Sequence, residues 1–143
     1  MAHLTQHTAL LTVQMNTGPD ILEITAELDG IIRESGIREG TLAATVVGST
    51  GSLTTIEYEL GVVADLEDAI ERLAPRGALY AHEEAWHDGN GHSHVQAALL
   101  GPSLHLPVRE GRLRLGTWQQ VVVINHDNRP RRRPIEVTVA GVK

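Results

Sequence analysis

The sequence predicts an α+β domain: a mainly antiparallel β-sheet or sandwich with two helices. Its 143 residues suit a single domain, residues 1–143, with a core of its own. Two segments space their apolar residues as an amphipathic helix does, and the other apolar segments are β-branched or alternate. In chain order this gives a strand, a helix, two strands, a helix and a run of strands, which favours the α+β class.

The first half of the chain predicts three strands and one helix. Residues 4–15 carry Thr and Val in partial alternation and predict a strand, which the NTGPD segment ends. Residues 20–36 predict a helix, because apolar residues recur at steps of three and four. They are Ile21, Ile24, Leu28, Ile31 and Ile32. Residues 41–47 and 52–59 predict two further strands, joined by the GSTG turn at 48–51.

The second half predicts one short helix and then strands only. Residues 66–77 have the apolar spacing of a helix, and Pro75 and Gly77 end it. The expected strands after it are 95–100, 104–108, 112–125 and 134–141, separated by GP, EG and DNRP turns. Tight turns of this kind join antiparallel strands.

Composition narrows the classes of function. The net charge is −6, and the only concentrated basic cluster is RPRRR at 129–133. We therefore expect no nucleic-acid partner, which would need a broad basic face, and a small anionic ligand instead. The absence of Cys excludes disulfides and thiolate zinc sites. No segment has the pattern of a signal peptide or a membrane span, so we expect a cytoplasmic protein without a membrane partner.

Half of the eight histidines lie within residues 82–94. If the HSHV segment begins a strand, His92 and His94 face the same side, since strand side chains alternate. Such a pair offers two imidazoles to one divalent metal, with His82 as the third ligand and one position open, as in catalytic zinc sites. His87 is the next candidate, and Asp88 would be a ligand or a hydrogen-bond acceptor for an imidazole. The alternative is a Gly-rich loop whose polar side chains bond its own backbone.

Two further polar groups are candidates. Arg129, Arg131 and Arg133 recur at period two, so on an extended segment they would line one face and form a phosphate clamp. The alternative is a solvated edge or a contact between subunits. Glu57 and Glu59 share one face of the strand predicted at 52–59. Glu57 would act as a general base if that face turned toward the histidines, and would be solvent-exposed otherwise.

A longer motif then becomes apparent. The run HDGNGHSHVQAALLGPSLHLPVREGRLRLGTWQQ, followed by DNRPRRR, resembles the YjbQ-type family, often called secondary thiamine-phosphate synthases. The resemblance covers essentially the whole chain. It implies an α+β fold, a homotrimer, and a histidine-containing site between subunits, with a bound metal in some members. The activity associated with the family is weak and joins a pyrimidine diphosphate to a thiazole phosphate.

The resemblance also suggests site residues. The matching positions are His82, His94, Asn90, Arg129, Arg131 and Glu57. The two histidines correspond to the family's most dependable ones, and Asn90 belongs to its N-x-x-x-H pattern. One departure concerns Gly48, which stands where many members have a histidine. If that histidine is a ligand elsewhere, either His92 or His87 replaces it here, or this branch of the family has a different site.

Together, these features predict a metal-supported enzyme that acts on a phosphorylated small molecule. The expected cofactor is a divalent metal such as zinc. The expected residues are His82, His92 and His94 for the metal, Asn90, Arg129 and Arg131 for the phosphorylated ligand, and Glu57 and Asp88 for proton transfer. The alternatives are a non-catalytic trimeric ligand-binding protein and a metal-dependent hydrolase.

Overall fold

The computed structural model describes residues 3–143, and in this range it contains two antiparallel sheets and four helices. The strands are β1 (Thr5–Met15), β2 (Asp20–Glu23), β3 (Glu39–Val46), β4 (Gly51–Ile56), β5 (Ser103–Arg109), β6 (Arg112–Leu113), β7 (Gln120–Asn125) and β8 (Arg131–Val142). The helices are α1 (Thr25–Ser35), α2 (Leu60–Leu73), α3 (His82–Trp86) and α4 (Gly91–Leu100). The predicted α+β class with mainly antiparallel strands is confirmed.

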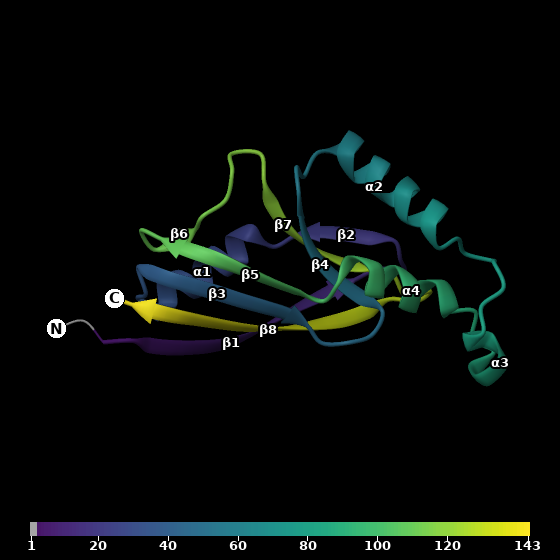
Figure 1. Cartoon of the computed structure of the whole chain (residues 1–143), viewed down its shortest axis with the longest axis horizontal. Helices are drawn as coiled ribbons and strands as arrows, with labels where there is room; N and C mark the ends of the chain where they lie inside the picture. The colour runs from purple at the N-terminus through teal and green to yellow at the C-terminus, as the bar shows by residue number, and fades with distance from the viewer. Residues whose placement is uncertain (1–2) are drawn as a thin grey trace.

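The larger sheet has the strand order β1-β8-β3-β5-β6, and the smaller sheet has the order β2-β7-β4. Figure 1 shows β1, β8 and β3 running along the length of the molecule, with the C-terminus at one end and α3 at the other. Along β8, alternate residues from Arg133 to Gly141 are buried, so one face of this sheet lies in the core.

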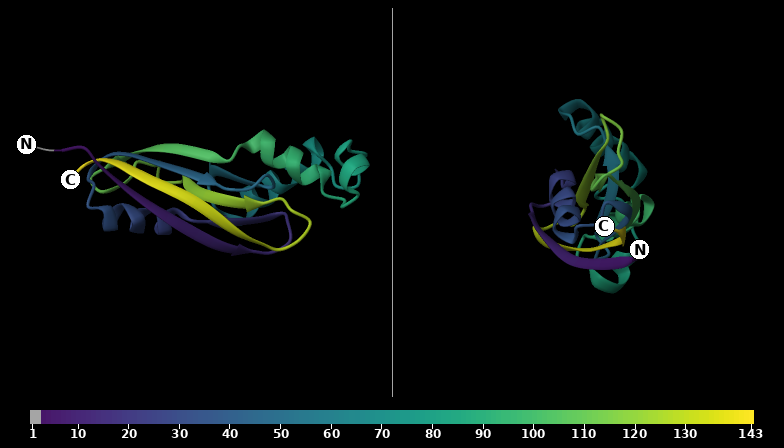
Figure 2. Two further views of the ribbon diagram at one scale, coloured as in Figure 1. Left: turned by 90° about the horizontal axis from the view of Figure 1, so that it is seen from below. Right: turned by 90° about the vertical axis from the view of Figure 1, so that its left-hand side faces the viewer.

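The core lies between that face and a second layer made of α1 and the smaller sheet (Figure 2). Leu28 and Ile32 of α1 are fully buried against it. Val121 and Val123 of β7 are also fully buried, and the whole cluster is aliphatic. Among residues 3–143, no helix has the length and apolarity that crossing a membrane requires.

The helix predicted at 20–36 begins five residues later than expected. Residues Asp20–Glu23 form β2, which pairs with β7, and Ile21 is buried against that strand pair. Pairing with β7 satisfies the backbone of this segment, so its helix-like apolar spacing is overruled by tertiary contact. The helix end is as predicted, because Gly36 adopts the left-handed conformation (φ 72°) that ends α1.

The second helix is longer than predicted. The strand expected at 52–59 stops at Ile56, and α2 begins at Leu60 rather than at residue 66. The reason is Glu59, whose carboxylate accepts hydrogen bonds from the backbone N–H groups of Gly61 (3.0 Å) and Val62 (2.6 Å). These bonds satisfy two of the unpaired donors of the first turn, so Glu59 caps the helix instead of ending the strand.

The most consequential correction concerns residues 82–100, where the sequence predicted a loop and a strand. The structure has two helices there, α3 and α4, and the strand expected at 95–100 is the second half of α4. This segment, VQAALL, is too short for its pattern to distinguish a buried strand from a helix. The strand expected at 112–125 is also divided, into β6 and β7, by a loop that contains the exposed Trp118.

Candidate functional site

A polar cleft of about 390 Å³ lies at the α3 end of the molecule. Three parts of the chain form its walls: the turn between β3 and β4 (residues 47–50), the residues around the start of α4, and the β7–β8 connection with the start of β8. Distant segments of the sequence therefore meet here, and they bring together many of the predicted site residues.

The floor of the cleft is Asp127, which is fully buried. Its Oδ2 accepts hydrogen bonds from Thr50 Oγ1 (2.9 Å) and from Arg131 Nε (2.9 Å). Burial by itself would raise the pKa of Asp127, but hydrogen bonds from Thr50, Asn90 and Arg131 outweigh it and hold the pKa below the ordinary value. Asp127 is thus an ionised carboxylate that holds an arginine in place.

Arg133 forms the second fixed cation of the cleft. Its side chain is buried, and its Nη2 donates to Thr50 Oγ1 and to Asn125 Oδ1, both at 2.6 Å. Burial lowers the pKa of Arg133 and the nearby Asp127 charge opposes this effect. Thr50 connects the two arginines, because it accepts from Arg133 and donates to the carboxylate that binds Arg131.

Gly48 has a structural reason to be glycine. Its φ of 147° is a conformation that other residues rarely adopt, and a Cβ there would lie 2.9 Å from Arg133 Nη1. A histidine at this position would therefore displace the Arg133 guanidinium. The buried arginine therefore gives a local reason why the histidine expected here from the resemblance is replaced by glycine.

His82 and His94 come together, as predicted. Their ring centroids are 4.5 Å apart, with the rings tilted by 38°. His82 is the first residue of α3, and His94 lies in the first turn of α4, where it lines the cleft. The proximity of these two histidines depends on both helices, neither of which the sequence pattern revealed.

His92 does not join this pair. On a helix, residues two apart point in nearly opposite directions, so the predicted same-face pair of His92 and His94 is wrong. His92 is buried and lines a small internal space with His126 and Gln96. Burial lowers the pKa of His92. A metal held by His82 and His94 therefore receives no third ligand from His92 within this chain.

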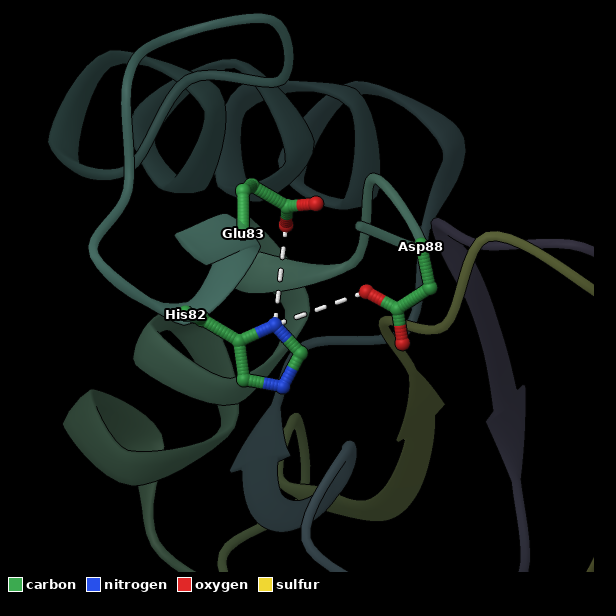
Figure 3. Close-up of side chains that lie close together, drawn as sticks. All are labelled: His82, Glu83 and Asp88. Atoms are coloured by element: carbon green, nitrogen blue, oxygen red, sulfur yellow. Dashed lines mark ion pairs between the residues drawn. The ribbon is translucent and has the colours of Figure 1, made fainter. Parts of the chain in front are cut away.

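A different set of ligands surrounds His82 (Figure 3). Its Nδ1 lies 3.5 Å from Glu83 Oε1 and 3.4 Å from Asp88 Oδ1, and it forms no hydrogen bond with any residue in the range 3–143. One nitrogen and two carboxylate oxygens all lie within 4.8 Å of one another, a donor set that suits a divalent ion such as zinc. The residues present thus fit a metal, although the set differs from the predicted one.

Glu83 also holds the segment between α3 and α4 in place. Its carboxylate accepts hydrogen bonds from the backbone N–H groups of Gly89 (2.6 Å) and Gly91 (2.9 Å). These bonds, with a smaller contribution from His82, lower the pKa of Glu83. Glu83 therefore joins α3 to the start of α4 and keeps His82 close to His94. No spacing in the sequence indicates this role.

Asn90 lines the cleft and is buried. Its Oδ1 accepts from Ser93 Oγ and from the backbone N–H of Asn128 (3.1 Å). Asp88 also lines the cleft, and its backbone carbonyl accepts from Asn128 Nδ2 at 2.8 Å. The start of α4 is thereby attached to the β7–β8 connection, which brings the histidines close to the arginines.

Two predicted residues lie outside this arrangement. Glu57 follows β4 and is exposed. The other end of β4 adjoins the cleft, since Gly51 pairs with Asn125 whereas Ile56 pairs with Gln120, so the strand separates Glu57 from the histidines. The condition for Glu57 to act as a base is not met within one chain. Arg129 is 62% exposed and does not line the cleft, and its Nε is 3.9 Å from Asp127 Oδ1.

A buried network behind the cleft fixes α4. Ser52 Oγ lies 2.8 Å from His126 Nε2, and His126 Nδ1 lies 2.9 Å from Gln96 Oε1. Burial, with repulsion from Arg133 and His92, lowers the pKa of His126 to about 4, so this imidazole is neutral at pH 7. The network joins β4, the β7–β8 connection and α4, which sets the position of His94 relative to the arginines.

Comparison with known proteins defines the class of protein that this fold and site represent. The profile of the family described as UPF0047 protein YjbQ-like matches residues 9–142. The UPF0047 protein of Methanothermobacter thermautotrophicus is 36% identical over 135 residues, covering 94% of this chain and 92% of that protein. UPF0047 protein YjbQ of Salmonella typhimurium is 36% identical over 120 residues, covering 83% and 84%. The chain belongs to the YjbQ-like UPF0047 family.

Solved structures agree with this assignment. A YbjQ-like protein of unknown function from Sulfolobus solfataricus superposes with a TM-score of 0.92 at 29% identity, covering 97% of this chain and 99% of that one. An uncharacterised protein of the YjbQ/UPF0047 family from Clostridium acetobutylicum gives a TM-score of 0.83 at 26% identity, covering 92% and 98%. The fold and the family are thus established, and the function rests on the site.

Proposed function

We propose that the chain is an enzyme that acts on a phosphorylated small molecule with the support of a divalent metal. The observation that carries this proposal is the arginine pair of the cleft: Arg131 and Arg133 are held by Asp127 and Thr50 beside His94. Fixed guanidinium groups lose little freedom when they bind an anion, which favours phosphate recognition. The reaction associated with the resemblance, which uses two phosphorylated substrates, agrees with such a clamp.

The charges that line the cleft favour an anionic ligand that contacts the arginines on one side and a metal ion near Asp88 on the other. Arg131, Arg132 and Arg133 face Asp88 and Asp127, so cations exceed carboxylates among the lining residues. A phosphate on the arginines would meet the acidic side of the cleft near Asp88. In the proposal a metal ion held by His82 and Asp88 separates these like charges.

The metal would supply Lewis-acid polarisation of a substrate oxygen. His82 and Asp88 would hold it, with Glu83 keeping His82 in place through the bonds to Gly89 and Gly91. His94 lies beside His82 and lines the cleft, so it is the side chain best placed to move a proton to or from a bound ligand. In this proposal His94 takes the proton-transfer role that the sequence assigned to Glu57.

The proposal includes the homotrimer that the family resemblance implies. Thr8 and Ala43 flank Thr138 in the larger sheet and face away from the core with it. These outward side chains are small and uncharged, which suits packing against another copy of the chain.

Arg131→Ala is expected to weaken binding of inorganic phosphate at least about tenfold, because it removes a charge-assisted, paired donor. The matched control is Arg129→Ala, which removes an exposed arginine of the same cluster and is expected to leave the affinity within about twofold. Isothermal titration of the untagged chain measures both. An equal loss in the two variants would mean that the cluster binds phosphate only by its net charge, contrary to the proposed clamp.

Metal binding gives an independent prediction. His82→Ala and Asp88→Ala are each expected to lower zinc affinity by about 10-fold or more, since each removes one ligand. His87→Ala is the control, because His87 is an exposed residue outside the ligand set. Elemental analysis and zinc titration of untagged protein are the measurements. Stoichiometric zinc that persists in both ligand variants would contradict this assignment.

A further inference from the structure

A second hollow adjoins the polar cleft. It has a volume of about 250 Å³ and shares Gly48, Ser49 and His94 with the cleft. Beyond these shared residues its walls are apolar and small, formed by Ala97, Ala98 and Pro102. The two hollows are therefore neighbours, one charged and one apolar, and His94 lines both.

The walls of the apolar hollow are fixed by backbone hydrogen bonds. Leu53 N donates to Gly101 O (3.1 Å), and Val46 N donates to Pro102 O (2.9 Å). The end of α4 is thereby tied to β3 and β4, the strands on either side of the Gly48 turn. Ala97 is buried and Ala98 is exposed, so the hollow has a packed wall and an open side. A preformed hollow of this kind does not have to be created when a ligand binds.

The small side chains explain why the hollow exists. A larger residue at Ala98 would fill the space beside the turn. The neighbouring arginines can bind only the anionic part of a ligand. An apolar group attached to that anion would remove apolar surface from water here, which is favourable at each buried carbon.

We propose that the ligand of this site is an organic phosphate that carries a short alkyl chain, attached through the ester oxygen. This inference rests on the proposed phosphate site. The phosphate lies on Arg131 and Arg133, and the apolar group lies against Ala97, Ala98 and Pro102. His94 lies beside the junction of the two parts of the ligand. The occupant of the apolar hollow is part of the ligand because the two hollows share three lining residues.

The test compares two phosphates that differ only in their alkyl group, methyl phosphate and n-butyl phosphate, by isothermal titration of the untagged chain. Each fully buried methylene is worth about fourfold in affinity. We expect butyl phosphate to bind at least about tenfold more tightly than methyl phosphate, which allows for incomplete burial of the chain. Butanol, which lacks the phosphate, is the probe for the hollow alone and is expected to bind far more weakly.

Ala98→Leu tests the location. Leucine fills the hollow and suits a helix, so this variant is expected to lose most of the butyl preference and to bind methyl phosphate as before. Ala64→Leu is the matched control, because Ala64 is an exposed alanine of a different helix, α2, and this variant should keep the preference. Sedimentation of each variant shows whether the assembly has changed.

Each outcome decides a different point. Equal affinity for the two phosphates overturns the inference and leaves the phosphate site intact. If neither methyl phosphate nor butyl phosphate binds, the proposed function and the inference are both contradicted. If the alkyl chain adds nothing and Ala98→Leu changes the sedimenting mass, the hollow is a contact between copies of the chain and the inference is wrong. A butyl preference that survives Ala98→Leu also contradicts the location.

Discussion

Arg133→Met is expected to lower the free energy of unfolding by about 3 kcal/mol, because it breaks a buried, charge-assisted hydrogen-bond network. The guanidinium bonds Thr50 and Asn125, and it lies close enough to the fully buried Asp127 to oppose that charge. Methionine keeps an unbranched stem that reaches as far as arginine Nε, so the loss reflects the missing guanidinium group with its charge and donors. The same variant is expected to lose phosphate binding, since one of the two fixed arginines is gone.

The control is Arg132→Met on the same strand. Arg132 is exposed, so its removal is expected to change the free energy of unfolding by less than about 0.5 kcal/mol. Urea unfolding at pH 7, followed by circular dichroism, measures both variants. If the two variants were equally stable, the buried network would contribute nothing, and the description of Arg133 as a fixed part of the cleft would have to be abandoned.

The unfolding free energy is also expected to fall by on the order of 3 kcal/mol between pH 7 and pH 4 through His126 alone. The pKa of this histidine is about 4 in the folded chain, against an ordinary value of 6.5. Between these values the unfolded chain binds the proton and the folded chain does not. The stability is therefore complete above about pH 6.5 and is lost as the pH falls toward the folded pKa.

His126→Gln removes this titration and is expected to show a shallower loss of stability with acid. The variant is less stable at pH 7, because Ser52 and Gln96 lose their partner, but the informative quantity is the slope with pH. Urea unfolding at pH 7, 5.5 and 4.5 gives that slope for both chains. Parallel curves would show that His126 titrates normally in the folded state. The lowered pKa of Asp127 acts separately: its contribution to stability is complete above the ordinary value of 3.8 and is lost as the pH falls from there toward the folded pKa, because the unfolded chain takes up the proton first.

The histidine cluster shows which part of the metal site could be predicted from the sequence. The histidine spacing predicted that His82 and His94 lie close together, and in the structure their rings are neighbours. The role given to His92 failed for a reason that lies in local geometry. Placing HSHV on a strand puts His92 and His94 on one face, whereas α4 puts them on opposite faces. An error in the type of one short element thus changed the whole expected ligand set.

The arginine segment shows a different limit. Its period of two was read correctly, because Arg131 and Arg133 do belong to one strand, β8, and both reach the cleft. The spacing does not rank the three arginines, and the family resemblance pointed to Arg129 and Arg131 rather than to Arg133. Arg133 belongs to the cleft because its guanidinium binds Thr50 and Asn125. Thr50 is distant in the sequence, and Asn125 lies on a different strand, β7. Asp127 was indistinguishable from an ordinary turn residue for the same reason.

By itself the sequence determined the class of the fold, the family, the aliphatic core and most strand positions, because these depend on composition and on apolar periodicity summed over many residues. Only the tertiary structure decided that residues 20–23 pair as a strand, that 91–100 are helical, and that Asp127 and Arg133 form the floor of the cleft. Each of these depends on a partner far away in the chain. Pairing with β7 or burial beside Thr50 contributes more free energy than the conformational preference of a few residues. Such distant contacts cannot be predicted from the local pattern of the sequence.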